Sequence, residues 1–179
     1  MRVSLWGIAA YLLLYASVVT GTALSSSFLR ARVPVLTRAG RPHEILSLGA
    51  LFASFVHAAA SMISPQGERL DWLLFVGPER GEPLGLSLGV AALYAAGVAV
   101  GSFYLRQRLA PVPWRGLHAL AYPGFLLAAW HSAALGANAW LGGLRLLYAI
   151  TVASAGLLAC GRAVEYATQP PRRPGTRGA

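Results

Sequence analysis

The amino-acid sequence predicts an all-α protein, a multi-pass membrane bundle of five transmembrane helices. Hydrophobic residues make up 56% of the 179 residues, and they gather in long runs. Most of the charged residues lie between these runs, as in membrane proteins. The only cysteine, Cys160, excludes an intramolecular disulfide and a thiolate metal cluster. Composition therefore points to a chain folded in a lipid bilayer.

Five apolar segments come close to the roughly 20 residues that a helix needs to cross a bilayer. In chain order they cover residues 5–24, 45–63, 84–105, 117–135 and 141–160. The first segment has an alternative interpretation as a secretory signal peptide, because Arg2 precedes it and small residues follow it. A shorter apolar piece, residues 70–76, is expected to form an interfacial turn of helix. Residues 1–165 are expected to form one membrane domain, and residues 166–179 a disordered cytoplasmic tail.

The arginines predict how the chain crosses the membrane. The formal net charge is +9, and arginine supplies all of the positive side chains. Arginines gather after the first span, after the third span and after the fifth: Arg30, Arg32, Arg38, Arg41, Arg106, Arg108, Arg115, Arg162, Arg172, Arg173 and Arg177. The loop after the second span instead holds four acids, Glu68, Asp71, Glu79 and Glu82. Because cytoplasmic loops carry an excess of basic residues, we expect a cell-membrane protein with its N-terminus outside and its C-terminus in the cytoplasm. Topology accounts for the charge, so no nucleic-acid partner is expected.

All four histidines of the chain lie on only two of the predicted spans. His43 and His57 belong to the second span, and His118 and His131 to the fourth. At a rise of 1.5 Å per residue, the two histidines of each helix are about 20 Å apart along the axis. Each helix therefore offers one histidine near the cytoplasmic side and one closer to the outer side. The two levels match between the helices.

The angular positions of these histidines agree on one helix only. Fourteen steps of about 100° leave His43 and His57 about 40° apart, nearly on one face. Thirteen steps leave His118 and His131 about 140° apart on an ideal helix. Pro123 lies between them and cannot donate a backbone hydrogen bond, so a kink or a change of winding is expected there. Whether both rings then share one face stays open at this point.

Two imidazoles on facing helices at each of two depths fit two b-type haems, since haem iron takes one axial ligand on each side of the macrocycle. One alternative is that each histidine makes an ordinary interhelical hydrogen bond. Another is zinc, but tetrahedral zinc needs clustered ligands, and these levels are about 20 Å apart. Arg38, Arg41 and Arg115 flank the cytoplasmic histidines. They are expected either to pair with haem propionates or to act only as positive-inside residues.

Two segments resemble a known family. They are "RPHEILSLGALFASFVHAAASM" and "PVPWRGLHALAYPGFLLAAWHSAALGANA". They are similar to the ferric-reductase-like transmembrane domain of ferric reductases, NADPH oxidases and the haem-binding subunit of the bacterial methionine sulfoxide reductase system. The resemblance covers most of residues 5–160 and implies two b haems, one on His43 with His118 and one on His57 with His131. It also implies electron transfer across the membrane.

Large oxidases of that family have six spans and a C-terminal flavin and nicotinamide domain. This sequence has five predicted spans and no nucleotide-binding pattern. The expected electron donor is therefore a cytoplasmic flavoprotein or another separate carrier. The expected acceptor, on the outer side, is ferric iron, oxygen, a quinone or a partner protein. Whether the chain is an enzyme by itself stays open.

The competing hypothesis is a haem-free membrane protein, either a small transporter or an assembly subunit of a larger complex. The predicted spans contain almost no acidic residues. Proton-coupled transporters usually relay protons through such residues, so the sequence favours the redox interpretation over a transporter.

Overall fold

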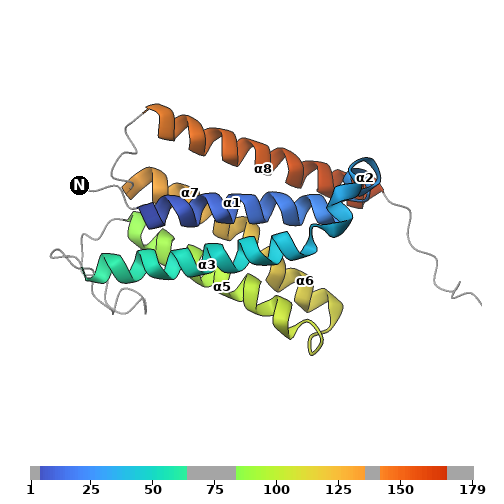
Figure 1. Ribbon diagram of the computed structural model, residues 1–179, viewed down its shortest axis with the longest axis horizontal. Coiled ribbons are helices and arrows are strands. Elements are labelled where there is room, and N and C mark those ends of the chain that lie inside the picture. The colour runs from blue at the N-terminus through green and yellow to red at the C-terminus, as the bar shows by residue number, and fades with distance from the viewer. Residues whose placement is uncertain (1–4, 64–83, 136–141, 169–179) are drawn as a thin grey trace, which may run out of the picture.

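The computed structural model describes residues 5–63, 84–135 and 142–168, and every element in these ranges is a helix (Figure 1). Four helices are long and apolar enough to cross a membrane. They are α1 (Leu5–Ser25), α3 (Gly40–Met62), α5 (Leu84–Leu105) and α8 (Gly142–Thr168). The all-helical, multi-pass membrane class predicted from the sequence is therefore confirmed. The predicted interfacial turn at residues 70–76 lies outside the described residues.

Four helices, and not the expected five, have the length of a membrane span. The predicted fourth span, residues 117–135, is divided between α6 (Pro111–Ala119) and α7 (Ala121–Leu135). Pro123 has no N–H to donate to the carbonyl of Ala119, where α6 ends. At the break, the N–H of Leu120 donates to the carbonyl of Leu117 at 3.2 Å. This bond spans three residues and not the four of an α-helix, so the turn is tighter. With 15 residues, α7 is about 22 Å long, which is shorter than the hydrocarbon core of a bilayer.

The long helices pack as two close pairs. Helix α1 packs along α3, α5 packs along α7, and α1 also contacts α7 and α8. Small side chains allow the second pair to come close. A Cβ atom placed on Gly124 of α7 would lie 3.0 Å from the Cβ of Ala95, and Ala92, Ala96 and Ala99 of α5 are buried. Close approach over small residues is how membrane helices gain van der Waals contact.

Hydroxyl groups join α1 to the neighbouring helices. The Tyr15 and Ser154 hydroxyls, on α1 and α8, are 2.8 Å apart, and Tyr11 makes a similar bond to Thr151. Beside these bonds Phe125 of α7 is 2% exposed and stacks on Tyr11 with ring centroids 5.7 Å apart. The core between α1, α7 and α8 is therefore aromatic, with its polar hydroxyls paired.

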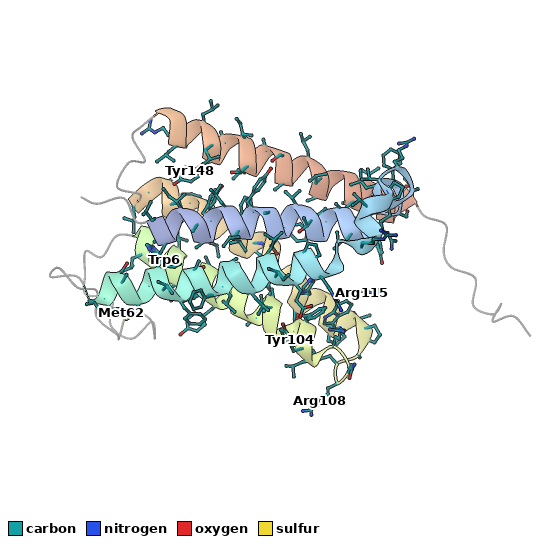
Figure 2. The ribbon with its side chains drawn as sticks, viewed as in Figure 1. Trp6, Met62, Tyr104, Arg108, Arg115 and Tyr148 are labelled. Carbon is teal, nitrogen blue, oxygen red and sulfur yellow. The ribbon has the colours of Figure 1, made fainter. Side chains whose placement is uncertain are left out.

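One end of the bundle carries most of the arginines that the structure describes, and we call it the arginine end. It contains the short helix α2 (Ser27–Arg32), the 3-10 helix η1 (Pro34–Arg38), α6 and the last turns of α8 (Figure 1). Figure 2 places Arg108 and Arg115 at this end and Met62, the last residue of α3, at the opposite end. Hydrogen bonds join the C-terminal end of α8 to the start of α2 here. Glu165 accepts them from the backbone N–H groups of Ser27 and Phe28 at 2.7 and 3.1 Å.

The helix α8 runs through Thr168, so residues 166–168, which the sequence assigned to the tail, are helical. The remainder of the expected tail, residues 169–179, lies outside the described residues. Large apolar side chains are exposed along the outer faces of the long helices, among them Ile45, Phe52, Leu146 and Leu157. Such a surface fits contact with a lipid bilayer.

Candidate functional site

The four histidines meet as two pairs between α3 and the divided α6–α7 segment. The rings of His43 and His118 have centroids 6.2 Å apart and planes at 83°. Those of His57 and His131 have centroids 6.1 Å apart and planes at 69°. We call His43 and His118 the arginine-end pair and His57 and His131 the distal pair. The structure thus brings together the same residues that the matched depths paired in the sequence.

The break between α6 and α7 answers the angular question that the sequence left open. On one continuous helix His118 and His131 would be about 140° apart. In the structure they lie on different helices, His118 near the end of α6 and His131 on α7, and each faces a histidine of α3. The interruption near Pro123 therefore lets both rings reach the same neighbouring helix.

Three of the four imidazoles are fixed through Nδ1 by a backbone carbonyl of another helix. The Nδ1 atom of His43 is 3.1 Å from the oxygen of Ser17, that of His118 is 3.0 Å from Ala99, and that of His131 is 2.8 Å from Gly85. A carbonyl oxygen can only accept, so Nδ1 is the protonated nitrogen in each ring. In the neutral imidazole Nε2 then carries the lone pair. Metal-binding histidines are commonly oriented in this way.

Two glycines make room for two of these rings. A Cβ atom on Gly89 of α5 would lie 2.5 Å from Nδ1 of His131. A Cβ atom on Gly21 of α1 would lie 2.8 Å from Cε1 of His43. Any larger residue at either position would push the ring away from its partner. Sequence reasoning missed both glycines, because their role depends on which helices become neighbours.

The spacing within each pair suits one metal atom between two imidazoles. A nitrogen–metal bond is about 2 Å long, and a ring with bonds of about 1.35 Å has its centroid about 1.1 Å from each atom. Two rings on opposite sides of one metal would then have centroids about 6.2 Å apart. The observed separations are 6.2 and 6.1 Å.

The number of protein ligands argues against zinc. Among the described residues, no group of three or more His, Cys, Asp and Glu side chains comes together as a metal site. Structural zinc takes four protein ligands and catalytic zinc usually three. A pair of histidines instead suits a metal whose other ligands come from a macrocycle.

The surroundings of the arginine-end pair are polar and aromatic. Trp114, one turn before His118 on α6, stacks on that ring with centroids 5.9 Å apart and planes at 23°. The spacing of four residues on one helix was a visible signal for this contact, and sequence reasoning missed it. The Tyr104 hydroxyl of α5 donates to the Glu44 carboxylate of α3 at 3.1 Å, next to His43 (Figure 2 labels Tyr104).

The three arginines predicted for this site lie near it and are exposed. Arg38 ends η1, Arg41 is in the first turn of α3 two residues before His43, and Arg115 is on α6 three residues before His118. Their positions at the arginine end are compatible with both predicted roles. One role is contact with a carboxylate of the ligand, and the other is to orient the chain in the membrane.

In comparisons with known proteins, no family model, no curated protein and no solved structure matches this chain. The case for its function therefore depends on the histidine pairs and on the fold that positions them.

Proposed function

We propose that this protein is a transmembrane electron-transfer protein that holds two b haems, one between His43 and His118 and one between His57 and His131. Haem would supply one-electron chemistry at each level. The four histidines would hold the two groups through their ring nitrogens, and the helices would fix the ring planes and keep the two sites apart along the bundle. The proposal includes membership of the ferric-reductase-like transmembrane family, as the sequence resemblance implies.

The observation that carries the proposal is the paired geometry of the histidines. Both pairs have the centroid separation that two imidazoles on one metal require. In three rings a carbonyl holds Nδ1 and leaves Nε2 as the ligand atom. Interhelical hydrogen bonding alone would not require two such pairs with nearly equal separations. Arg38, Arg41 and Arg115 are proposed to pair with propionates of the haem at the arginine end, since guanidinium groups match carboxylates in shape.

The direction of transfer follows from the charge asymmetry of the bundle. We propose that the arginine end faces the cytoplasm of the cell, with the N-terminus outside and the C-terminus inside. Electrons would then enter at the arginine-end pair from a flavoprotein or another cytoplasmic donor. They would leave from the distal pair to an acceptor on the outer side. An acidic donor would be attracted to the arginine end.

A haemochrome assay tests the proposal. Purified protein from cells with adequate haem supply is expected to carry close to two b haems per chain, both low-spin with bis-histidine ligation. His57→Ala or His131→Ala should remove the distal haem preferentially, and His43→Ala or His118→Ala the other. A colourless wild-type protein would overturn the proposal in favour of a haem-free transporter or assembly subunit. Equal loss from all four variants would contradict two separate sites.

A further inference from the structure

Trp114 carries a buried hydrogen-bond donor that nothing in the described part of the chain satisfies. Its Nε1 atom is buried and has no hydrogen-bond partner there. Buried polar atoms are nearly always paired, and leaving one unpaired destabilises the folded protein. The indole N–H is therefore free to donate to a group outside the described part of the chain.

The position of Trp114 narrows the kind of partner. Its ring stacks on the imidazole of His118, which in turn faces His43. The indole ring of Trp114 therefore contacts one member of the arginine-end pair directly. The adjacent residue, Arg115, is exposed, and Arg41 lies in the first turn of α3, the helix that carries His43. The positive charge of the arginine end suits an anion, and a carboxylate can accept hydrogen bonds both from an indole N–H and from guanidinium groups.

We propose that Trp114 is a positioning residue for the ligand of the arginine-end pair. Its ring fixes the plane of the His118 imidazole, and its Nε1–H donates to a carboxylate of the ligand held between His43 and His118. This inference rests on the proposed function, in which that carboxylate is a haem propionate. Among the described residues the distal pair has no equivalent, because Trp130, which precedes His131 in the sequence, is 64% exposed. The two sites therefore differ in how they hold the same ligand.

Two matched tryptophan substitutions test the proposal. Trp114→Phe keeps an aromatic ring beside His118 but removes the N–H, and Trp130→Phe makes the same change beside His131. In Trp114→Phe, one of the two haems should pass to a haem-scavenging apoprotein about tenfold faster or more, as expected for a lost hydrogen bond to a charged group. The other haem should leave at the wild-type rate. Trp130→Phe should change neither rate.

A redox titration gives a second measurement that a purely structural role would not change. Without the N–H, the carboxylate charge is less well compensated and favours the oxidised metal. The midpoint potential of the haem at the arginine end should fall in Trp114→Phe, while the other potential stays the same. Trp114→Ala also removes the stacking, so it should additionally change the electron paramagnetic resonance g-values of that low-spin haem.

The outcomes separate this inference from the proposed function. A wild-type protein without haem overturns both. A wild-type protein with two haems, together with a Trp114→Phe variant that matches Trp130→Phe in release rates and potentials, overturns only the role of Trp114. Equal acceleration of both haems in Trp114→Phe would also overturn it, because a general loosening of the bundle would then explain the effect.

Discussion

Two glycines, Gly21 and Gly89, set the positions of two histidine rings by having no side chain. Each belongs to a helix that carries no histidine, yet a Cβ atom there would overlap an imidazole. The ring is the mobile end of the contact, so a larger residue would displace the ring before it displaced the helix. These glycines therefore control the separation within each histidine pair.

Gly89→Ala is expected to disturb the distal pair alone. The new methyl group would come within 2.5 Å of the present position of the His131 Nδ1 and would force that ring from the Gly85 carbonyl. The purified variant should lose most of one haem and keep the other, as measured by haemochrome content. Gly97→Ala on the same helix is the control, since nothing lies within 4 Å of its new methyl group. Two intact haems in Gly89→Ala would contradict the role of the glycine.

Gly21→Ala is expected to disturb the other pair. The methyl group would meet Cε1 of His43 at 2.8 Å and weaken its bond to the Ser17 carbonyl. Haem loss should then resemble that of His43→Ala in its optical spectrum and differ from that of Gly89→Ala. If both glycine variants lost the same haem, the assignment of one glycine to each pair would be wrong.

At this scale the sequence predicted the histidines but not what surrounds them. The residues themselves and their depths follow from composition and from the rise of a helix, so the pairs were predictable. The carbonyls of Ser17, Gly85 and Ala99 could not be predicted. Every residue has a backbone carbonyl, and only the packing of α1 and α5 decides which carbonyl lies beside a histidine.

The divided α6–α7 segment is the element on which both histidine pairs depend. The sequence predicted a disturbance at Pro123, and the structure has the break at Leu120, next to the carbonyl that the proline leaves without a donor. The sequence also predicted that residues 117–135 form one membrane span. A hydropathy profile does not detect a missing backbone N–H. Counting the apolar residues of each segment therefore predicted one long helix too many.

Pro123→Ala is expected to restore an N–H donor for the Ala119 carbonyl and to favour one continuous helix from α6 into α7. Continuity would rotate His118 away from His43, since it would return His118 and His131 to about 140° apart. Haem at the arginine-end pair should fall while thermal stability of the apoprotein stays the same or rises. Pro111→Ala, at the start of α6 where a proline is favoured, serves as the control. Full haem content in Pro123→Ala would show that packing alone sets the position of α6.

Hydrogen bonds between side-chain hydroxyls join α1 to α8. Tyr15→Phe removes the bond to Ser154 of α8 and keeps the ring, so it should lower the free energy of unfolding by about 0.6 kcal/mol, the average for such bonds in membrane helices. Unfolding in detergent–bilayer mixtures measures the change. A double-mutant cycle with Ser154→Ala isolates the pair. Additive effects would mean that the two hydroxyls do not stabilise each other.

On the scale of the whole molecule, the distribution of charge is expected to set how the chain is oriented in a membrane. The described arginines gather at the arginine end, with Arg145 of α8 as an exception among them. A reporter fused after Arg173 is expected to be active in the cytoplasm, and a label placed within residues 68–82 is expected to be accessible from outside. The reverse pattern would invert the order of the two sites relative to the membrane. The same reporter, fused to a variant in which glutamate replaces Arg106 and Arg108, gives the matched comparison.

The separation of the histidines along the chain sets an order for biosynthesis. His43 precedes His118 by 75 residues, and both histidines of α3 enter the membrane before either partner has been translated. At about 5–20 residues per second, ribosomes need about 4–15 s to add those 75 residues. During that interval α1 and α3 can pair, but neither histidine of α3 has its partner histidine. If the proposed function holds, haem loading would have to wait until α7 has been inserted, and cells short of haem would accumulate chains with all their helices but no completed sites.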